Sequence, residues 1–174
     1  AVVEQLGRRG TSTDARLLAP LARSSPSLLV RAEATRALGR LDYKKHRGVI
    51  EANLKVKTYR DGVAAAAVGA LAASRDPAVS KKLISILKPP HHFGARIAAI
   101  RALGEYASVT PDAVPALLEL LSEPDERISL IACASLGRMN DERALPQLEK
   151  AAKSAGNPRM RVYATESIAR IKAG

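Results

Sequence analysis

The sequence predicts an all-α solenoid built from repeated helix pairs, and two observations lead to that fold class. The first is an internal repeat with a period of 32 or 33 residues; a period of about 20 to 50 residues is typical of solenoids, in which each unit packs against its neighbours. The second is composition: hydrophobic residues make up 47% of the 174 residues, but aromatic residues only 3%. Small aliphatic side chains favour closely packed helices. We therefore expect a right-handed stack of antiparallel helix pairs.

Each repeat aligns on one apolar residue in its second helix. These anchors are Leu38, Leu71, Leu103, Leu136 and Ile168. An alanine stands four residues before every anchor, at Ala34, Ala67, Ala99, Ala132 and Ala164. Positions four residues apart share one helix face. The pattern predicts that anchors and alanines face the core at crowded helix contacts.

The repeat also sets the domain organisation. We expect a single domain, 1–174, with five repeats at 13–41, 42–74, 75–107, 108–140 and 141–174. Proline-containing breakers separate the helices; at Thr110-Pro111 the threonine would cap a helix whose first position is proline. Leu6 and Gly7 repeat the pattern of Leu38 and Gly39, so residues 1–12 are interpreted as the end of a partial repeat. We therefore expect a fragment of a longer protein, with an irregular N-terminal cap as the alternative.

Two short patterns carry a family resemblance. The second helices follow V-R-x-x-A-x-x-A-L-G, as at Val30, Arg31 and Ala34, and a first helix opens with D-E-R-A-L-P at 141–146. These patterns resemble HEAT repeats, most closely the short alanine-rich subtype named for phycobilisome lyases. The stretches 58–77 and 87–107 are also similar to the C-terminal HEAT-like domain of thermolysin-clan zinc aminopeptidases. That resemblance implies an accessory domain without catalytic residues, which shapes access to the active-site cleft or mediates assembly.

The sequence contains none of the common catalytic motifs, such as H-E-x-x-H or the phosphate-binding glycine loops. His91 and His92 would need further ligands to hold zinc. Cys133 has small or β-branched equivalents in the other repeats, which indicates a core residue. We therefore expect no enzymatic activity, no cofactor and no metal for this chain. With one cysteine and no long apolar run, we also expect no membrane span, and we favour the cytoplasm.

The formal net charge of +11 is concentrated in the N-terminal half. Residues 1–88 contain 17 Lys and Arg against 7 Asp and Glu, whereas residues 89–174 contain 11 against 10. Clustered cations suit the phosphates of nucleic acids. A nucleic-acid-binding solenoid is therefore one alternative function, with this candidate basic patch: Arg40, Lys44, Lys45, Arg47, Lys55, Lys57 and Arg60.

Arginines also recur on the second helices, where equivalent positions form a ladder along one face. The candidate binding surface is the concave face that carries Arg31, Arg36, Arg96, Arg101 and Arg138. An arginine just after the opening valine usually pairs with an acid of a neighbouring repeat, and Asp61 and Glu126 are the candidate partners. We favour a protein partner, either another domain of the parent chain or a separate protein. Nucleic acid is the alternative partner, and a chromophore-lyase-like scaffold is a further alternative function.

Overall fold

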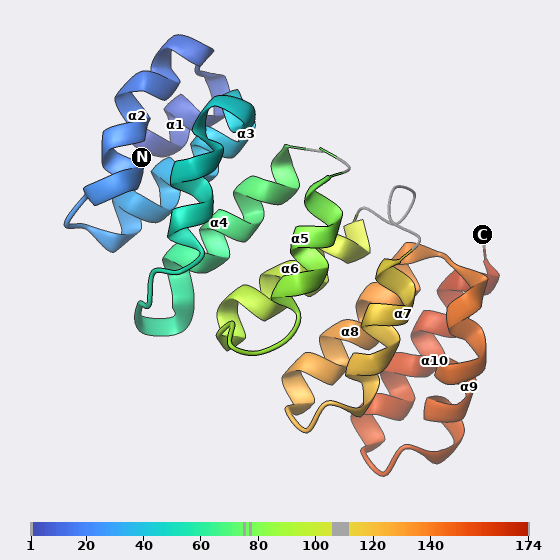
Figure 1. Ribbon diagram of the computed structural model, residues 1–174. Helices are drawn as coiled ribbons and strands as arrows, with labels where there is room; N and C mark the ends of the chain where they lie inside the picture. The colour runs from blue at the N-terminus through green and yellow to red at the C-terminus, as the bar shows by residue number, and fades with distance from the viewer. Residues whose placement is uncertain (1, 75, 77, 106–111, 174) are drawn as a thin grey trace.

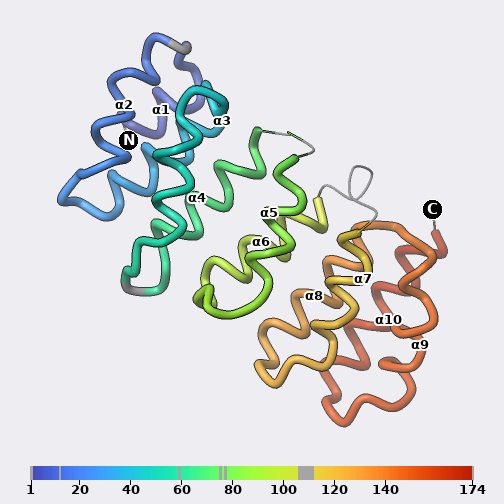
Figure 2. The backbone as a smooth tube through the Cα atoms, in the orientation of Figure 1, coloured from blue at the N-terminus to red at the C-terminus, as the bar shows by residue number. Residues whose placement is uncertain are grey.

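The chain folds as an α-solenoid, as the sequence predicts (Figure 1). The computed structural model describes residues 2–74, 76, 78–105 and 112–173. Helix pairs follow one another along a single direction from the N-terminus to the C-terminus, as the backbone tube shows (Figure 2). The described residues form helices, turns and loops, without strands. None of their helices is both long and apolar enough to cross a membrane.

The second helices of the repeats form one continuous layer, in which each packs against the next. Its members are α1 (Val2–Arg9), the first part of α3 (Leu28–Asn53), α4 (Gly62–Ala73), α6 (Phe93–Glu105), α8 (Glu126–Met139) and α10 (Pro158–Lys172). The first helices form the other layer. Its members are α2 (Ser12–Ser24), the second part of α3, α5 (Val79–Ile86), α7 (Ala113–Glu119) and α9 (Leu145–Ser154).

Short 3₁₀ turns complete the described helical structure. They are η1 (Tyr59–Asp61), which leads into α4, η3 (Leu120–Ser122), which ends the α7 segment, and η4 (Glu142–Ala144), which leads into α9. Such turns are common where an α-helix begins or ends. The predicted helix start at Thr110-Pro111 lies outside the described residues.

Helix α3 joins two repeats without an intervening loop. Its backbone leaves the helical region only at Asp42, where φ is −162° and ψ is 71°. The Asp42 carboxylate accepts a hydrogen bond from the backbone N–H of Lys45 at 3.2 Å, which is the contact that a helix-capping residue makes. The kink therefore marks the change from the second helix of one repeat to the first helix of the next.

The core lies between the two layers, and the predicted positions form part of it. The anchors Leu38, Leu71, Leu103 and Leu136 are fully buried, as is the alanine four residues before each anchor. In the last repeat the anchor Ile168 is half-buried, while Ile171 one turn later is buried. The prediction of crowded contacts at these positions is confirmed.

A glycine directly after the anchor allows neighbouring second helices to approach closely. A Cβ atom at Gly39 would lie 2.4 Å from the backbone of Ala70 in the next repeat. Gly104 and Gly137 face Ser135 and Ser167 in the same way, at 2.8 and 2.7 Å from the serine Cβ atoms. Any side chain at these glycines would push two second helices apart.

Candidate functional site

The outward surface of the second-helix layer is the first candidate binding surface. We call it the second-helix face and define it by the positions two before and two after each anchor: Arg36, Gly69, Arg101, Ala134, Glu166, Arg40, Ala73, Glu105, Arg138 and Arg170. Arg101 and Arg138 are exposed there and have no hydrogen bond or ion pair with another described residue. Arg36 is half-buried and paired with Glu33 one turn earlier. Arg36, Arg101 and Arg138 therefore lie on the face that the sequence predicts as a binding surface.

Arg31 does not lie on this face but between two repeats. Its Nε and Nη2 atoms donate hydrogen bonds to the Asn53 side-chain oxygen at 3.0 and 2.7 Å. The Asn53 amide in turn donates to the Ala22 carbonyl and to the Thr35 hydroxyl, and Asn53 is almost fully buried. A buried network in which every member has a partner rigidifies its surroundings. The position of Arg31 is therefore explained by the joint between repeats.

Arg96, at the equivalent position of a later repeat, is also tied into a joint. Its guanidinium donates to the Leu87 carbonyl at 2.6 Å and pairs with the Glu123 carboxylate at 2.9 Å. Only 8% of the Arg96 surface is exposed. An acid of the next repeat is thus its partner, as the sequence suggests, but the acid is neither Asp61 nor Glu126.

The two acids proposed as partners make a different contact between repeats. Asp61 accepts a hydrogen bond from the backbone N–H of Gly94 at 3.0 Å, and Glu126 pairs with Arg159 at 3.2 Å. Both contacts join a residue ten before one anchor to a residue nine before the next. The pairing hypothesis was wrong in its register because the start of each second helix, rather than the arginine within it, lies beside these acids.

The candidate basic patch divides between the two layers. Arg40 lies on the second-helix face, where its Nε donates to the Gly7 carbonyl at 3.0 Å. The other members follow the kink of α3 or the loop after it. Arg47 pairs with Glu51 at 2.9 Å, and Arg60 is also engaged in an interaction. Four exposed lysines of the patch have no side-chain partner among the described residues: Lys44, Lys45, Lys55 and Lys57.

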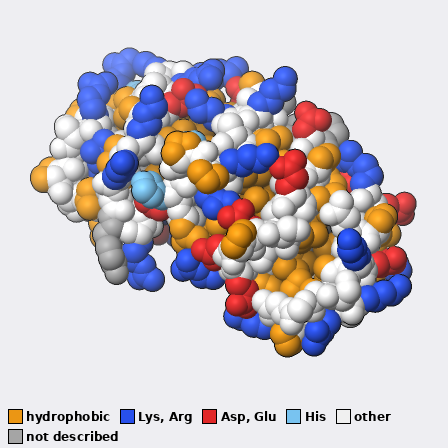
Figure 3. Space-filling model, turned by 60° about the horizontal axis from the view of Figure 1, so that its bottom comes forward, with side chains coloured by type: hydrophobic (Ala, Val, Ile, Leu, Met, Phe, Trp, Pro, Cys, Tyr) orange, Lys and Arg blue, Asp and Glu red, His pale blue; other side chains and the backbone are white. Residues whose placement is uncertain are grey.

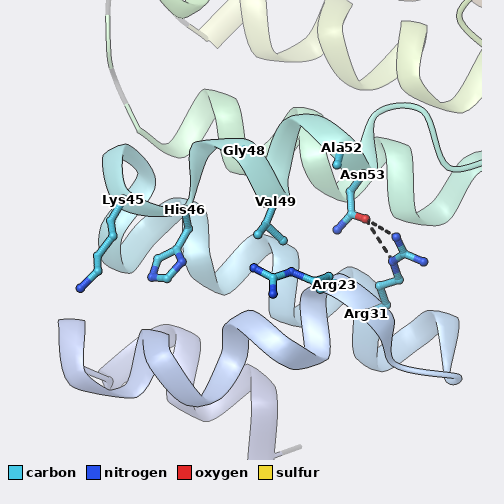
Figure 4. Close-up of a pocket in the computed structure, with 8 residues that line it drawn as sticks. All are labelled: Arg23, Arg31, Lys45, His46, Gly48, Val49, Ala52 and Asn53. Atoms are coloured by element: carbon cyan, nitrogen blue, oxygen red, sulfur yellow. Dashed lines mark hydrogen bonds between the residues drawn. The ribbon is translucent and has the colours of Figure 1, made fainter.

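A hollow between α2 and α3 gathers several cationic side chains (Figure 4). We call it the α2–α3 hollow; it has a volume of about 510 Å³ and is lined by Arg23, Arg31, Lys45, His46, Gly48, Val49, Ala52 and Asn53. In Figure 4 the Arg23 side chain extends toward the His46 ring, and Lys45 lies on the far side of His46. No carboxylate is among the described lining residues. The hollow is therefore a cationic site on the first-helix layer.

A second hollow lies on the other side of the same helix segment. This α3–α5 hollow has a volume of about 500 Å³ and is lined by Gly48, Glu51, Ala52, Leu54, Lys55, Lys82, Ser85 and His91. Burial opposes ionisation of Glu51, but the Arg47 hydrogen bond and the Lys82 charge bring its pKa below the ordinary value. Burial, together with the charges of Lys82 and His92, lowers the pKa of His91. Glu51 is therefore ionised and His91 neutral at pH 7.

Charged side chains are distributed unevenly over the surface of the molecule. Lys and Arg side chains crowd one end of the molecule, whereas Asp and Glu side chains are more frequent toward the centre and the other end (Figure 3).

Arg23 and His46 were not predicted from the sequence, although both line the α2–α3 hollow. The sequence signal that was available is the cluster of cations around Gly48. Because glycine has no side chain, it leaves a shallow depression on the outer surface of a helix.

The remaining candidates from the sequence have structural surroundings. Cys133 is fully buried, and burial raises the pKa of its thiol to about 11. A thiol of this kind carries no thiolate near pH 7, so the interpretation of Cys133 as a core residue is confirmed. Within the described part of the chain, His, Cys, Asp and Glu side chains form no group that could hold a metal ion.

Sequence comparison places this solenoid in a known family. HEAT repeats match residues 15–104 and again residues 81–169, so the chain belongs to the HEAT repeat family. The crystal structure of an engineered protein from the Northeast Structural Genomics Consortium superposes with a TM-score of 0.53 at 19% identity, over 99% of this chain and 97% of that chain. This likeness concerns the fold alone. A search of curated proteins finds no match.

Proposed function

We propose that the chain is a non-catalytic protein-interaction domain that binds its partner through the second-helix face. Membership of the HEAT repeat family supports an interaction scaffold in general. The observation that carries the choice of face is the bare outer surface of α4. Gly62 and Gly69 are exposed, and a Cβ atom at either would meet nothing within 4 Å. A partner can therefore approach the α4 backbone closely, between Arg36 on one side and Arg101 on the other.

The resemblance of 58–77 and 87–107 to the C-terminal domain of zinc aminopeptidases suggests the partner. We infer that the second-helix face contacts a catalytic module of the same parent protein. The coding region upstream of Ala1 tests this parentage: an H-E-x-x-H motif is the expected result, and an upstream region without it would reject the aminopeptidase parent.

The contact itself is tested in the parent protein with Arg101→Glu and Arg138→Glu combined. If acidic groups of the catalytic module contact this face, the change lowers the kcat/KM of the parent protein. Alternatively, the domain dissociates from the catalytic module once a protease has cut the chain between them. The combination Lys150→Glu and Lys153→Glu on α9 is the matched control, because both lysines are exposed and the net charge changes equally. Equal behaviour of the two variants would contradict the proposed face.

The exposed, unpartnered lysines of α3 favour nucleic acid as a second candidate ligand. Binding of a single-stranded oligonucleotide would weaken steeply with salt, because each neutralised phosphate releases counterions. The combination Lys44→Glu, Lys45→Glu and Arg47→Glu is expected to abolish such binding, and affinity that survives it would contradict this function. No observation on the described residues favours the chromophore-lyase-like alternative, which stays a prediction.

A further inference from the structure

We propose that the two hollows beside Gly48 form one docking site for an acidic peptide segment of a partner protein. The α2–α3 hollow would bind the carboxylates, and small aliphatic side chains of the peptide would cover Gly48, Val49 and Ala52. The site lies on the first-helix layer and does not depend on the second-helix face. We call the combined surface the Gly48 trough; it consists of the lining residues of the two hollows.

The two hollows communicate across α3. Gly48 and Ala52 line both of them, and residues four apart share one face of a helix. Gly48 is exposed, and a Cβ atom there would meet nothing within 4 Å. The helix ridge between the hollows is therefore low at this turn, so an extended chain can cross it without moving any side chain.

Unpaired cationic side chains at both ends of the trough favour the binding of an anion. Arg23 and Lys45 are exposed and have no side-chain partner among the described residues. Within the same hollow the Nε2 atom of His46 is buried and makes no hydrogen bond to any described residue. Unpaired cations in one hollow repel each other, and a carboxylate relieves that repulsion while it accepts their hydrogen bonds. Across the ridge, Lys55 is likewise unpartnered, and the one carboxylate among the described residues of that hollow, Glu51, is paired with both Arg47 and Lys82.

The floor of the trough favours a peptide over a nucleic acid. Between the cations the lining is aliphatic, at Val49, Ala52 and Leu54, and it gains from contact with apolar groups. No Phe, Tyr or Trp side chain lines either hollow within the described part of the chain, and His46 and His91 are the aromatic rings there. Single-stranded nucleic acids usually need aromatic side chains on which bases stack. A peptide that alternates carboxylates with small aliphatic residues matches both features.

The test uses a fluorescein-labelled, capped peptide of about eight alternating Glu and Val residues, long enough at about 3.4 Å per residue to span both hollows. Fluorescence anisotropy measures its affinity for the whole chain. The expected result is binding at least about ten-fold tighter than that of the Gln and Val version, since charge-assisted hydrogen bonds are roughly twice as strong as neutral ones. Equal affinity for both peptides would overturn the proposal.

Two variants and two matched controls locate the binding. Arg23→Ala with Lys45→Ala, and separately Gly48→Phe, are each expected to weaken binding about ten-fold or more. Lys150→Ala with Lys153→Ala removes the same charge from α9, and Gly156→Phe adds the same bulk at an exposed glycine between α9 and α10, where a Cβ atom would likewise meet nothing within 4 Å. Each control is expected to change affinity less than about two-fold. Circular dichroism confirms first that each variant is folded.

Each other outcome overturns the proposal. Affinity retained in Gly48→Phe would exclude the trough, and equal weakening by the α9 control would show non-specific charge attraction. Loss of binding in a further variant, Gly69→Phe, and not in Gly48→Phe would instead place the peptide on the second-helix face. An oligothymidine that displaces the peptide and loses affinity in Gly48→Phe would identify a nucleic-acid site. Proton NMR adds an independent readout: the ring signals of His46 are expected to shift with peptide, and unmoved signals would contradict the proposal.

Discussion

The two halves of the solenoid have the same helix-pair architecture but use their charged side chains differently. Residues 89–174 hold almost as many acids as cations, and among the described residues there five cations are paired: Arg96–Glu123, Arg127–Asp125, Arg143–Asp141, Arg159–Glu126 and Lys172–Glu149. Residues 1–88 have 17 cations against 7 acids, an excess of ten, although Arg8, Arg36, Arg47 and Lys82 are paired with acids. In residues 1–88 several exposed cations have no partner among the described residues, among them Arg23, Lys44, Lys45, Lys55 and Lys57. Because the same packing is achieved in both halves, the excess charge of the first half is not needed for the fold. We infer that it serves binding.

Two arginines at the same repeat position, seven residues before the anchor, also differ in the charge of their partners. Arg31 is held by the neutral amide of Asn53, whereas Arg96 is held by the carboxylate of Glu123. A neutral acceptor leaves the positive charge of Arg31 uncompensated at the edge of the α2–α3 hollow. The joint between repeats is therefore stabilised in both cases, but only the charge of Arg96 is neutralised by its partner.

The largest expected effect concerns the close approach of second helices. Gly39→Ala places a Cβ atom 2.4 Å from the Ala70 backbone, which cannot move without separating α3 from α4. We expect a loss of roughly 3 kcal/mol in the free energy of unfolding. Gly104→Ala in the C-terminal half meets the Ser135 side chain at 2.8 Å, and we expect a loss of about 1 to 2 kcal/mol. Urea denaturation measures both, and a larger loss for Gly104→Ala would contradict this order.

The next prediction concerns the two contacts that hold an arginine between repeats, Arg31 with Asn53 and Arg96 with Glu123. Asn53→Ala leaves the Ala22 carbonyl and part of the Arg31 guanidinium without partners, and we expect a loss of about 2 to 3 kcal/mol. Glu123→Gln keeps a hydrogen-bond acceptor for Arg96 but removes the charge, and we expect a loss of about 1 kcal/mol. The stabilities are measured in low salt and in about 1 M salt, where ionic contacts are screened. A salt effect confined to the Asn53 joint would contradict the comparison.

The fold was predictable because its determinants repeat. Five aligned segments identify the anchors and the alanines before them, and three of the segments also show a glycine after the anchor. Packing of equivalent helices follows from those positions. The continuity of α3 was not predicted, because the kink depends on the backbone of Asp42 and no proline or glycine marks it. The partner of Arg31 was also missed, since sequence spacing favours an acid and gives no means to identify a neutral amide 22 residues away.

The candidate site was predictable only in part. Charge counting identified the N-terminal half and the lysines of α3. It did not identify Arg23 or His46, because these residues meet only when α2 folds against the second part of α3. The arginine ladder was likewise divided by the structure: Arg101 and Arg138 face outward, whereas Arg31 and Arg96 lie in joints between repeats, and a linear pattern does not separate these environments.

A smaller effect is expected from pH. Hydrogen bonds from Arg127 and Arg143 lower the pKa values of the Asp125 and Asp141 carboxyls. Their stabilising contribution is therefore present above the unfolded pKa of about 3.9 and is lost as the pH falls through the lower folded values. Asp125→Asn with Asp141→Asn is expected to flatten the fall of Tm below about pH 4. Asp14→Asn provides the comparison in the N-terminal half, where hydrogen bonds from Thr11 lower the pKa of Asp14. An unchanged acid profile in the C-terminal double variant would contradict this assignment.

The smallest change in the stability of the protein is expected when the unpaired lysines of α3 are replaced. Lys44→Gln with Lys45→Gln removes two exposed charges whose side chains make no hydrogen bond or ion pair with the described residues. The free energy of unfolding is expected to change by less than about 0.5 kcal/mol. Thermal denaturation measures this change. A destabilisation of more than about 1 kcal/mol would show that the excess charge of the N-terminal half contributes to the fold after all.

Locating a bound peptide shows whether the N-terminal half uses its unpaired cations for binding. The acidic Glu and Val peptide carries a nitroxide at one end, and paramagnetic relaxation is recorded on the backbone amides of the whole chain. We expect signal loss centred on Gly48 and Ala52, with α8 to α10 unaffected. Signal loss centred on α8 to α10, or spread evenly over both halves, would contradict this use of the N-terminal cations.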